Sequence, residues 1–241
     1  MRKIAIIALM PAALTFVCCS VKEDRSGCPG WLYLELSPRS LALAGNYPTR
    51  VSILHAGGED TLLLSKDYPS DWIQVKKGAV ELNALLGNGA SDLQAWGEEC
   101  DSLWAYSAVF TMQAEESSAL VTLHKRFATI WFSFDDAPAT DQYSMVIRSP
   151  GEFRCLLEPS GGEASARLPA IGDASLELCC LSSDGGGTLW EWDLGAALLA
   201  AGYDWGAEDL SDARVRVSLA PLDISVSVVP WEGNSGLTLE L

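Results

Sequence analysis

The chain has 241 residues, which is enough for one large domain or two of ordinary size. Hydrophobic residues make up 49% of the chain and charged residues 20%, a balance that excludes a disordered tail or a coiled coil and predicts a sizeable core. The 32 acidic residues against 16 basic ones give a formal net charge of −16, and such a surface repels phosphate groups. The charge therefore argues against nucleic acid as a partner.

The first residues have the pattern of a secretory signal. Arg2 and Lys3 are basic, residues 4–17 carry no charge, and Cys18 and Cys19 follow. The uncharged run is shorter than the roughly 20 apolar residues that span a bilayer, so it predicts a cleaved signal and not a transmembrane helix. We interpret residues 1–18 as a lipoprotein signal peptide and Cys19 as the lipidated residue. Cys18 is the alternative lipidation site. A different interpretation is that Cys18 and Cys19 are simply two buried thiols or a disulfide pair.

A short charged segment follows the cysteines. Lys22 is followed by the acidic residues Glu23 and Asp24. Charges of this kind keep a linker solvated and extended. A lysine followed by two acidic residues, directly after a lipidated cysteine, also resembles the export signal that places lipoproteins of Bacteroidota on the outer face of the outer membrane. We therefore expect a lipid-anchored, surface-exposed protein with a linker over residues 19–30.

The remaining cysteines define no framework. They are Cys28, Cys100, Cys155, Cys179 and Cys180. Their number is odd and their spacing irregular, so the sequence leaves any disulfide pairing open. The two histidines, His55 and His124, lie far from them in sequence, and we expect no zinc site.

Most of the chain after the linker alternates between apolar and polar residues, the period of a β-strand with one face on a core. Residues 120–134 form two successive runs, of which the second is apolar on both faces and predicts a central strand. The other predicted strands fall at residues 32–36, 51–53, 104–110, 143–147, 176–181, 214–219, 224–229 and 237–241. Turn-forming residues separate these runs.

Two short segments have helical patterns. Ala79 to Leu86 ends at Gly87, and Leu194 to Ala201 follows Asp193, a good N-cap residue. Each is about two turns long and too short to organise a fold. The sequence therefore predicts an all-β protein with short helical connections and two tandem β-sandwich domains, over residues 31–125 and 126–241. A single elongated sandwich is the alternative.

Motifs for catalysis are not evident. The adjacent acidic residues at 98–99, 115–116 and 135–136 would point to opposite faces of a strand, so they do not form the facing carboxylate pair of a glycosidase. Neither histidine has a nucleophile elbow near it. The glycine-rich run at 182–188 lies between two strand-like segments and predicts a hairpin, not a phosphate-binding loop. We expect no enzymatic activity and no cofactor.

Tryptophan suggests one alternative function. The chain has nine tryptophans, and although core packing is their commoner use, a flat indole can also stack on a sugar ring. Trp190 and Trp192 are the best candidates for such a platform, because they would share one strand face next to the glycine-rich turn. A surface glycan-binding lipoprotein is therefore the alternative reading.

Three stretches of the sequence resemble one family. They are CSVKEDRSGCP followed by WLYLEL at residues 19–36, VTLHKRFATIWFSF at 121–134, and ISVSVVPWEGNSGLTLEL at 224–241. In their order and spacing these stretches resemble the anchoring subunits of the Bacteroidales type V fimbriae, also called fimbrillin-A associated anchor proteins. Together they cover the start, the middle and the end of the exported chain.

The resemblance implies a fold, a location and a partner. The fold would be two transthyretin-like β-sandwiches, and the protein would be lipid-anchored at the outer membrane and hold a fimbrillin stalk subunit of a fimbrium (pilus). Such subunits join when a strand of one pairs with an open sheet edge of the next. The last predicted strand is one possible joining element, with Leu237, Leu239 and Leu241 on one face and Thr238 and Glu240 on the other.

Overall fold

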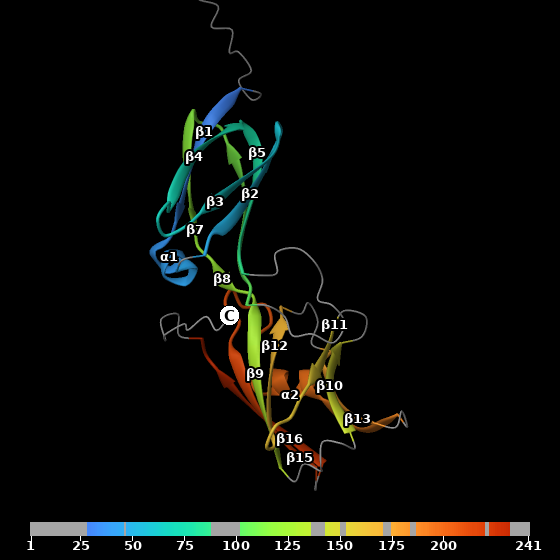
Figure 1. Ribbon diagram of the computed structural model, residues 1–241. Helices are drawn as coiled ribbons and strands as arrows, with labels where there is room; N and C mark the ends of the chain where they lie inside the picture. Colours follow the sequence, from blue (N-terminus) through green and yellow to red (C-terminus); the bar gives the residue numbers. More distant parts are fainter. Residues whose placement is uncertain are drawn as a thin grey trace, which may run out of the picture.

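The computed structural model of the chain is built almost entirely from β-strands (Figure 1). It describes residues 28–45, 47–87, 102–135, 143–149, 153–170, 175–183, 187–219 and 222–231. Sixteen strands and two short helices lie in these ranges, which confirms the all-β class. No helix in this part of the chain is long and apolar enough to cross a membrane.

The N-terminal half forms a sandwich of two sheets. A three-stranded sheet has the order β4-β1-β7, with bounds Ser70–Lys76, Pro29–Leu36 and Glu116–Val121. A five-stranded sheet has the order β3-β2-β5-β6-β8, with bounds Gly58–Leu64, Thr49–His55, Gly78–Leu86, Trp104–Met112 and His124–Lys125. Buried side chains of both sheets belong to one apolar cluster, so the sheets pack face to face.

The C-terminal half forms a second sandwich. One sheet has the order β11-β10-β13-β14, with bounds Phe153–Leu157, Tyr143–Ser149, Glu177–Ser182 and Thr188–Asp193. The other has the order β12-β9-β15-β16, with bounds Glu163–Pro169, Phe127–Asp135, Asp212–Leu219 and Leu222–Val229. Their inner faces share a separate apolar cluster. The first core ends at Phe127 and the second begins at Ala128, just after the predicted boundary between residues 125 and 126.

The structure corrects one helix, confirms another and adds a third. Residues 79–86 belong to strand β5, not to a helix, and Val80, Leu82, Ala84 and Leu86 are buried at a period of two. The segment pairs with β2 on one side and with β6 on the other, and these two ladders override its modest helix propensity. Gly87 has a φ of 145° and lies against the backbone of Ser102, so it serves a close approach and does not cap a helix.

The two helices are both short connections. Helix α2, Leu194–Ala200, begins as predicted at Asp193, whose carboxylate accepts a hydrogen bond from the Ala196 amide. Helix α1, Pro38–Ala44, was not predicted. Its signal is Ser37, whose hydroxyl accepts from the Ser40 amide at 3.1 Å, followed by a proline at the first helical position.

A cluster of charged residues connects the two sandwiches. Asp209 precedes β15, and its carboxylate accepts from the Arg39 guanidinium in α1, from His124 Nδ1 at 3.2 Å and from the Lys125 amide at 2.8 Å. The buried ammonium group of Lys125 forms an ion pair with Asp212. These contacts fix the chain between β8 and β9, where it passes from one sandwich to the other (Figure 1).

Aromatic packing strengthens the same junction. Trp231, which follows β16, lies with its ring centroid 5.3 Å from that of Trp104 in the N-terminal sandwich. The Arg39 guanidinium lies 4.6 Å from the Trp231 ring centroid, a cation–π distance. The C-terminal end of the described chain is therefore held against the N-terminal core.

We predict different responses to the truncation of two leucines in the N-terminal sandwich. Leu82 is completely buried, whereas Leu63 is 61% exposed. Leu82→Ala should lower the free energy of unfolding by about 2–5 kcal/mol, because it leaves a cavity. Leu63→Ala should change it by no more than about 0.5 kcal/mol. Equal losses in urea denaturation of the two variants would contradict the assignment of the core.

We also predict that Asp209→Asn destabilises the protein in a pH-dependent way. Burial raises the pKa of Asp209, but hydrogen bonds from Arg39, from the Lys125 amide and from His124 outweigh it, and the pKa lies below its ordinary value. The ionised form is therefore favoured by folding, and its stabilisation is present above the ordinary pKa and lost as the pH falls through the lowered one.

At neutral pH the loss should be about 1–3 kcal/mol, the range for a hydrogen-bonded charge. The difference between wild type and variant should narrow below about pH 4, near the unfolded-state pKa. Thermal denaturation across this range measures it, with Asp67→Asn at an exposed position as the control. If the stability difference between wild type and Asp209→Asn grew as the pH fell, the ionised Asp209 would not be the stabilising form, and this prediction would be wrong.

Candidate functional site

The site residues predicted from the sequence lie outside the described residues. Cys19, Lys22, Glu23 and Asp24 precede residue 28, and the strand at 237–241 follows residue 231. Their roles remain predictions. The structure does place the neighbours of both segments, because β1 begins at Pro29 and Trp231 packs against Trp104.

The prediction of a sugar platform at Trp190 and Trp192 is wrong. The hairpin itself is confirmed, because β13 and β14 pair in antiparallel and the Ser182 amide donates to the Gly187 carbonyl. The face that the two tryptophans share, however, points inward. Trp192 is 6% exposed within the C-terminal core, and Trp190 is half-buried against that core.

The two histidines hold neighbouring segments together. His55 Nδ1 accepts hydrogen bonds from the Gly57 and Lys76 amides, so the proton is on Nε2, which lies 2.8 Å from an Asp60 carboxylate oxygen. His124 contacts Asp209 at the junction. The His55 imidazole is thus bound to the backbone, and the His124 imidazole to the carboxylate of the junction.

One group of potential metal ligands occurs in the described chain. The ligand atoms of Glu177, Cys179 and Glu191 lie within 4.8 Å of one another. Arg148 occupies the position between the carboxylates, with Nε 2.6 Å from Glu177 and Nη2 3.1 Å from Glu191. Because the guanidinium already forms an ion pair with each carboxylate, we interpret the group as an ion-pair network.

Strand β6 presents the feature most suited to joining another chain. One side of β6 pairs with β5 along nine residues, from Trp104 to Met112. The other side pairs with β8 only at Trp104 and Ala105. In the described part of the chain no strand pairs with the remaining stretch, which we call the open edge of β6, Tyr106–Met112.

The inward face of this open edge is incompletely covered. Val80, Leu82 and Ala84 on β5 are fully buried. Their direct partners on β6 are Phe110, Ala108 and Tyr106, and all three are only half-buried. On the inward face of this sheet, the side chains are therefore less buried on β6 than on the neighbouring strand β5.

The cause lies in the opposite sheet. Among the described residues that sheet has three strands and ends at β7, so these strands do not cover all five that face them. Along β7 the inward residues Ser117 and Ala119 are also half-buried. In the described ranges, the free sides of β6 and β7 thus combine backbone without a strand partner with partly exposed inward side chains, a combination that an added strand satisfies.

The sequence indicated the strand but not its open edge. The alternation over residues 104–110 correctly assigns Trp104, Tyr106, Ala108 and Phe110 to one face. Whether such a face is covered depends on the length and number of strands opposite it, which periodicity does not encode.

The geometry defines a protein of two tandem β-sandwiches with an open edge on the first, and solved structures with the same fold are known. No family model matches the chain, and a search of curated proteins finds no match. The fimbrial anchor protein Mfa2 from Porphyromonas gingivalis has a TM-score of 0.56 and 14% identity, over 85% of this chain and 98% of Mfa2.

Two other structures are similar over most of their length. A DUF1812 protein from Bacteroides thetaiotaomicron, for which polysaccharide binding has been proposed, has a TM-score of 0.57 and 11% identity, over 86% of this chain and all of that one. A candidate adhesin from Bacteroides ovatus has a TM-score of 0.52 and 10% identity, over 83% of this chain and 90% of that one. The chain therefore shares the fold of fimbrial anchor and adhesin proteins of the Bacteroidales, as the sequence resemblance implied.

We predict that two of the cysteines are chemically inert. Burial raises the pKa of Cys180 to about 11, and it also raises the pKa of Cys179. At pH 8 few of these thiols are ionised, and only the thiolate reacts with an alkylating agent. Iodoacetamide should therefore modify the exposed Cys28 of the folded protein and leave Cys179 and Cys180 unmodified, as measured by peptide mass spectrometry. Equal labelling of all three would contradict their burial.

Proposed function

We propose that this chain is a surface lipoprotein that anchors a fimbrium to the outer membrane and joins its fimbrillin stalk subunit by β-strand complementation. The similarity to Mfa2, which extends over 98% of that fimbrial anchor protein, is the observation that carries the proposal. The role is non-enzymatic, and the site is an interaction surface. In this proposal residues 31–125 and 126–241 are the two domains of the anchor.

Attachment to the membrane would depend on lipid. The net charge of −16 gives no electrostatic attraction to an anionic lipid surface, so a hydrophobic anchor is needed. We assign this anchor to Cys19 and the surface location to the segment Lys22, Glu23 and Asp24. Acyl chains contribute about 0.8 kcal/mol per buried CH₂, so several chains on one cysteine hold a protein stably.

The stalk subunit would bind at the open edge of β6. A strand added there satisfies alternate amides and carbonyls of Tyr106–Met112, and its side chains cover Tyr106, Ala108 and Phe110. The strand at 237–241 is a second proposed joining element, which would act on a neighbouring subunit.

The lipid anchor is tested by metabolic labelling. Cells that express the chain are fed an alkyne fatty acid, and label should be lost in Cys19→Ala, because no other thiol would carry the lipid. Cys28→Ala, the control, should keep full label. Label that persists in Cys19→Ala but disappears in Cys18→Ala would move the anchor by one residue.

The joining edge is tested with two lysine substitutions on neighbouring residues. Ala108→Lys places a charge on the inward face of the open edge, a device that discourages strand addition. Val109→Lys places the same charge on the outward face, where Val109 is 73% exposed. Copurification of fimbrillin should fall by about tenfold or more for Ala108→Lys, equivalent to about 1.4 kcal/mol, and stay unchanged for Val109→Lys. Equal binding by both folded variants would exclude this edge.

A further inference from the structure

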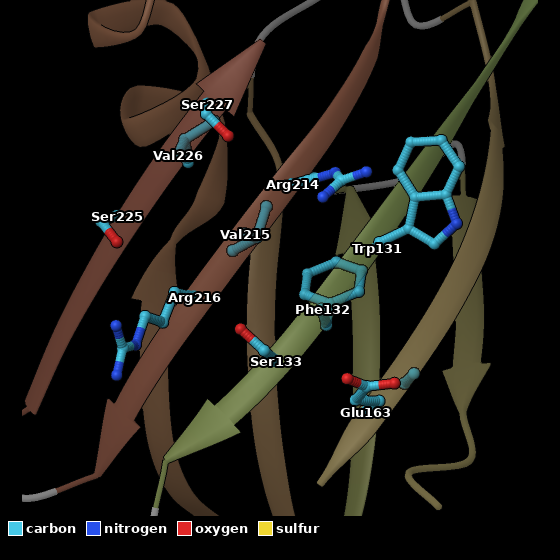
Figure 2. Close-up of a pocket in the computed structure, with 11 residues that line it drawn as sticks. Trp131, Phe132, Ser133, Glu163, Arg214, Val215, Arg216, Ser225, Val226 and Ser227 are labelled. Atoms are coloured by element: carbon cyan, nitrogen blue, oxygen red, sulfur yellow. The ribbon is translucent and has the colours of Figure 1, made fainter. Parts of the chain in front are cut away.

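A shallow groove lies on the outer face of the C-terminal sandwich, away from the open edge of β6. It has a volume of about 450 Å³ and crosses the sheet β12-β9-β15-β16. Figure 2 shows its lining, with Trp131 on β9, Arg214 and Arg216 on β15, and two serines on β16. A volume of this size falls in the range of small-ligand sites, which is about 300–1,000 Å³.

Strand register places the polar residues in two rows across the sheet. Trp131 pairs with Arg214, which pairs with Ser227, and these three form the first row. The second row is Glu163, Ser133, Arg216 and Ser225. Strands lie about 4.8 Å apart, so the first row spans roughly 10 Å. An indole, two guanidinium groups, a carboxylate and three hydroxyls therefore face the same groove.

Arg214 has no carboxylate partner in the described part of the chain. Its guanidinium carbon lies 5.8 Å from the centroid of the Trp131 ring, and both side chains are exposed. Arg216, by contrast, is paired with Asp135 at 2.7 Å. In a chain with twice as many acidic as basic residues, an arginine without an acidic partner, held beside an aromatic ring, is a defined position for an external anion.

The mixture of groups selects the chemistry of the ligand. The Trp131 side chain is 40% exposed, so part of its flat apolar ring is free to contact the C–H face of a sugar ring. Serine hydroxyls and the Glu163 carboxylate match sugar hydroxyls as donors and acceptors. The Arg214 guanidinium matches a carboxylate, with which arginine forms two parallel hydrogen bonds.

We propose that this groove binds a short acidic oligosaccharide, with a sugar ring on Trp131 and a uronate carboxylate on Arg214. This inference does not depend on the role in a fimbrium, because it concerns the other sandwich and another class of ligand. It also replaces the sugar platform that the sequence suggested at Trp190 and Trp192, which face the core.

Isothermal titration calorimetry of the full-length protein in detergent with trigalacturonate tests the proposal. Carboxyl-reduced trigalacturonate, a neutral ligand of the same shape, is the control ligand. Trp131→Ala and Arg214→Gln should each weaken the binding of trigalacturonate by about tenfold or more. Trp72→Ala is the matched control protein, because Trp72 is 48% exposed on the N-terminal sandwich, and it should bind as wild type does.

Three results would overturn the proposal. They are no binding of trigalacturonate by the wild type, equal affinity for its carboxyl-reduced form, and equal losses in Trp72→Ala and Trp131→Ala. Thermal unfolding of each variant checks that the C-terminal sandwich is intact, and both groove side chains are exposed enough for their loss to be tolerated. Fimbrillin copurification should be unchanged by Trp131→Ala, which separates this site from the joining edge.

Discussion

The unequal width of the two N-terminal sheets is the constraint on which the rest of this structure depends. In the described part of the chain three strands face five, so the core is closed over β2 and β5 and only partly covered over β6. Trp104 and Met112 at the two ends of β6 are buried, while the residues between them on the same face are not. Within the described residues the domain therefore has a buried core and one strand edge without a pairing partner, the feature on which the proposed strand complementation depends.

The junction gives the open edge a fixed relation to the second sandwich. Lys125 lies on β8, the two-residue strand that pairs with the start of β6, and its buried ammonium group bonds to Asp212 at the start of β15. Asp209 connects the same place to helix α1. Removing one partner of such a buried pair leaves an uncompensated charge, so the network favours one arrangement of the two halves. Strand β6 is therefore connected to the second sandwich through β8 and this network.

Most central strands were predictable from the sequence, and most of the strands that were missed lie at sheet edges, although the edge strand β16 was predicted at residues 224–229. The predicted runs at β2, β9, β10, β13 and β15 all lie inside sheets, where one or both faces are buried. Four strands that had no predicted counterpart, β3, β4, β11 and β12, are edge strands. Strand β3 buries only Leu64 and β4 only Val75, so neither has a clear alternation. Strand β5 was predicted to be a helix because AVELNALL also suits two helical turns. Its pairing with β2 and β6 makes this segment a strand.

The two candidate sites could not be predicted from the sequence periodicity, because both depend on how strands are arranged. The open edge depends on which strands lie opposite β6, and the groove depends on the register that brings residue 131 beside residue 214. The sequence showed an alternating arginine strand and an apolar strand, without their pairing. The proposed lipid anchor, in contrast, needs no folded structure, because Cys19 and its flanking residues are read as a linear signal.

Hydrogen exchange of the chain in isolation and within purified fimbriae tests the central claim most directly. If a partner strand pairs with the open edge of β6, as we propose, the amides of the peptide Tyr106–Met112 should become protected from exchange on assembly. The edge strand β3, Gly58–Leu64, is the internal reference and should exchange equally in both states. Protection confined to β3, or identical exchange of Tyr106–Met112 in the two samples, would contradict joining at this edge.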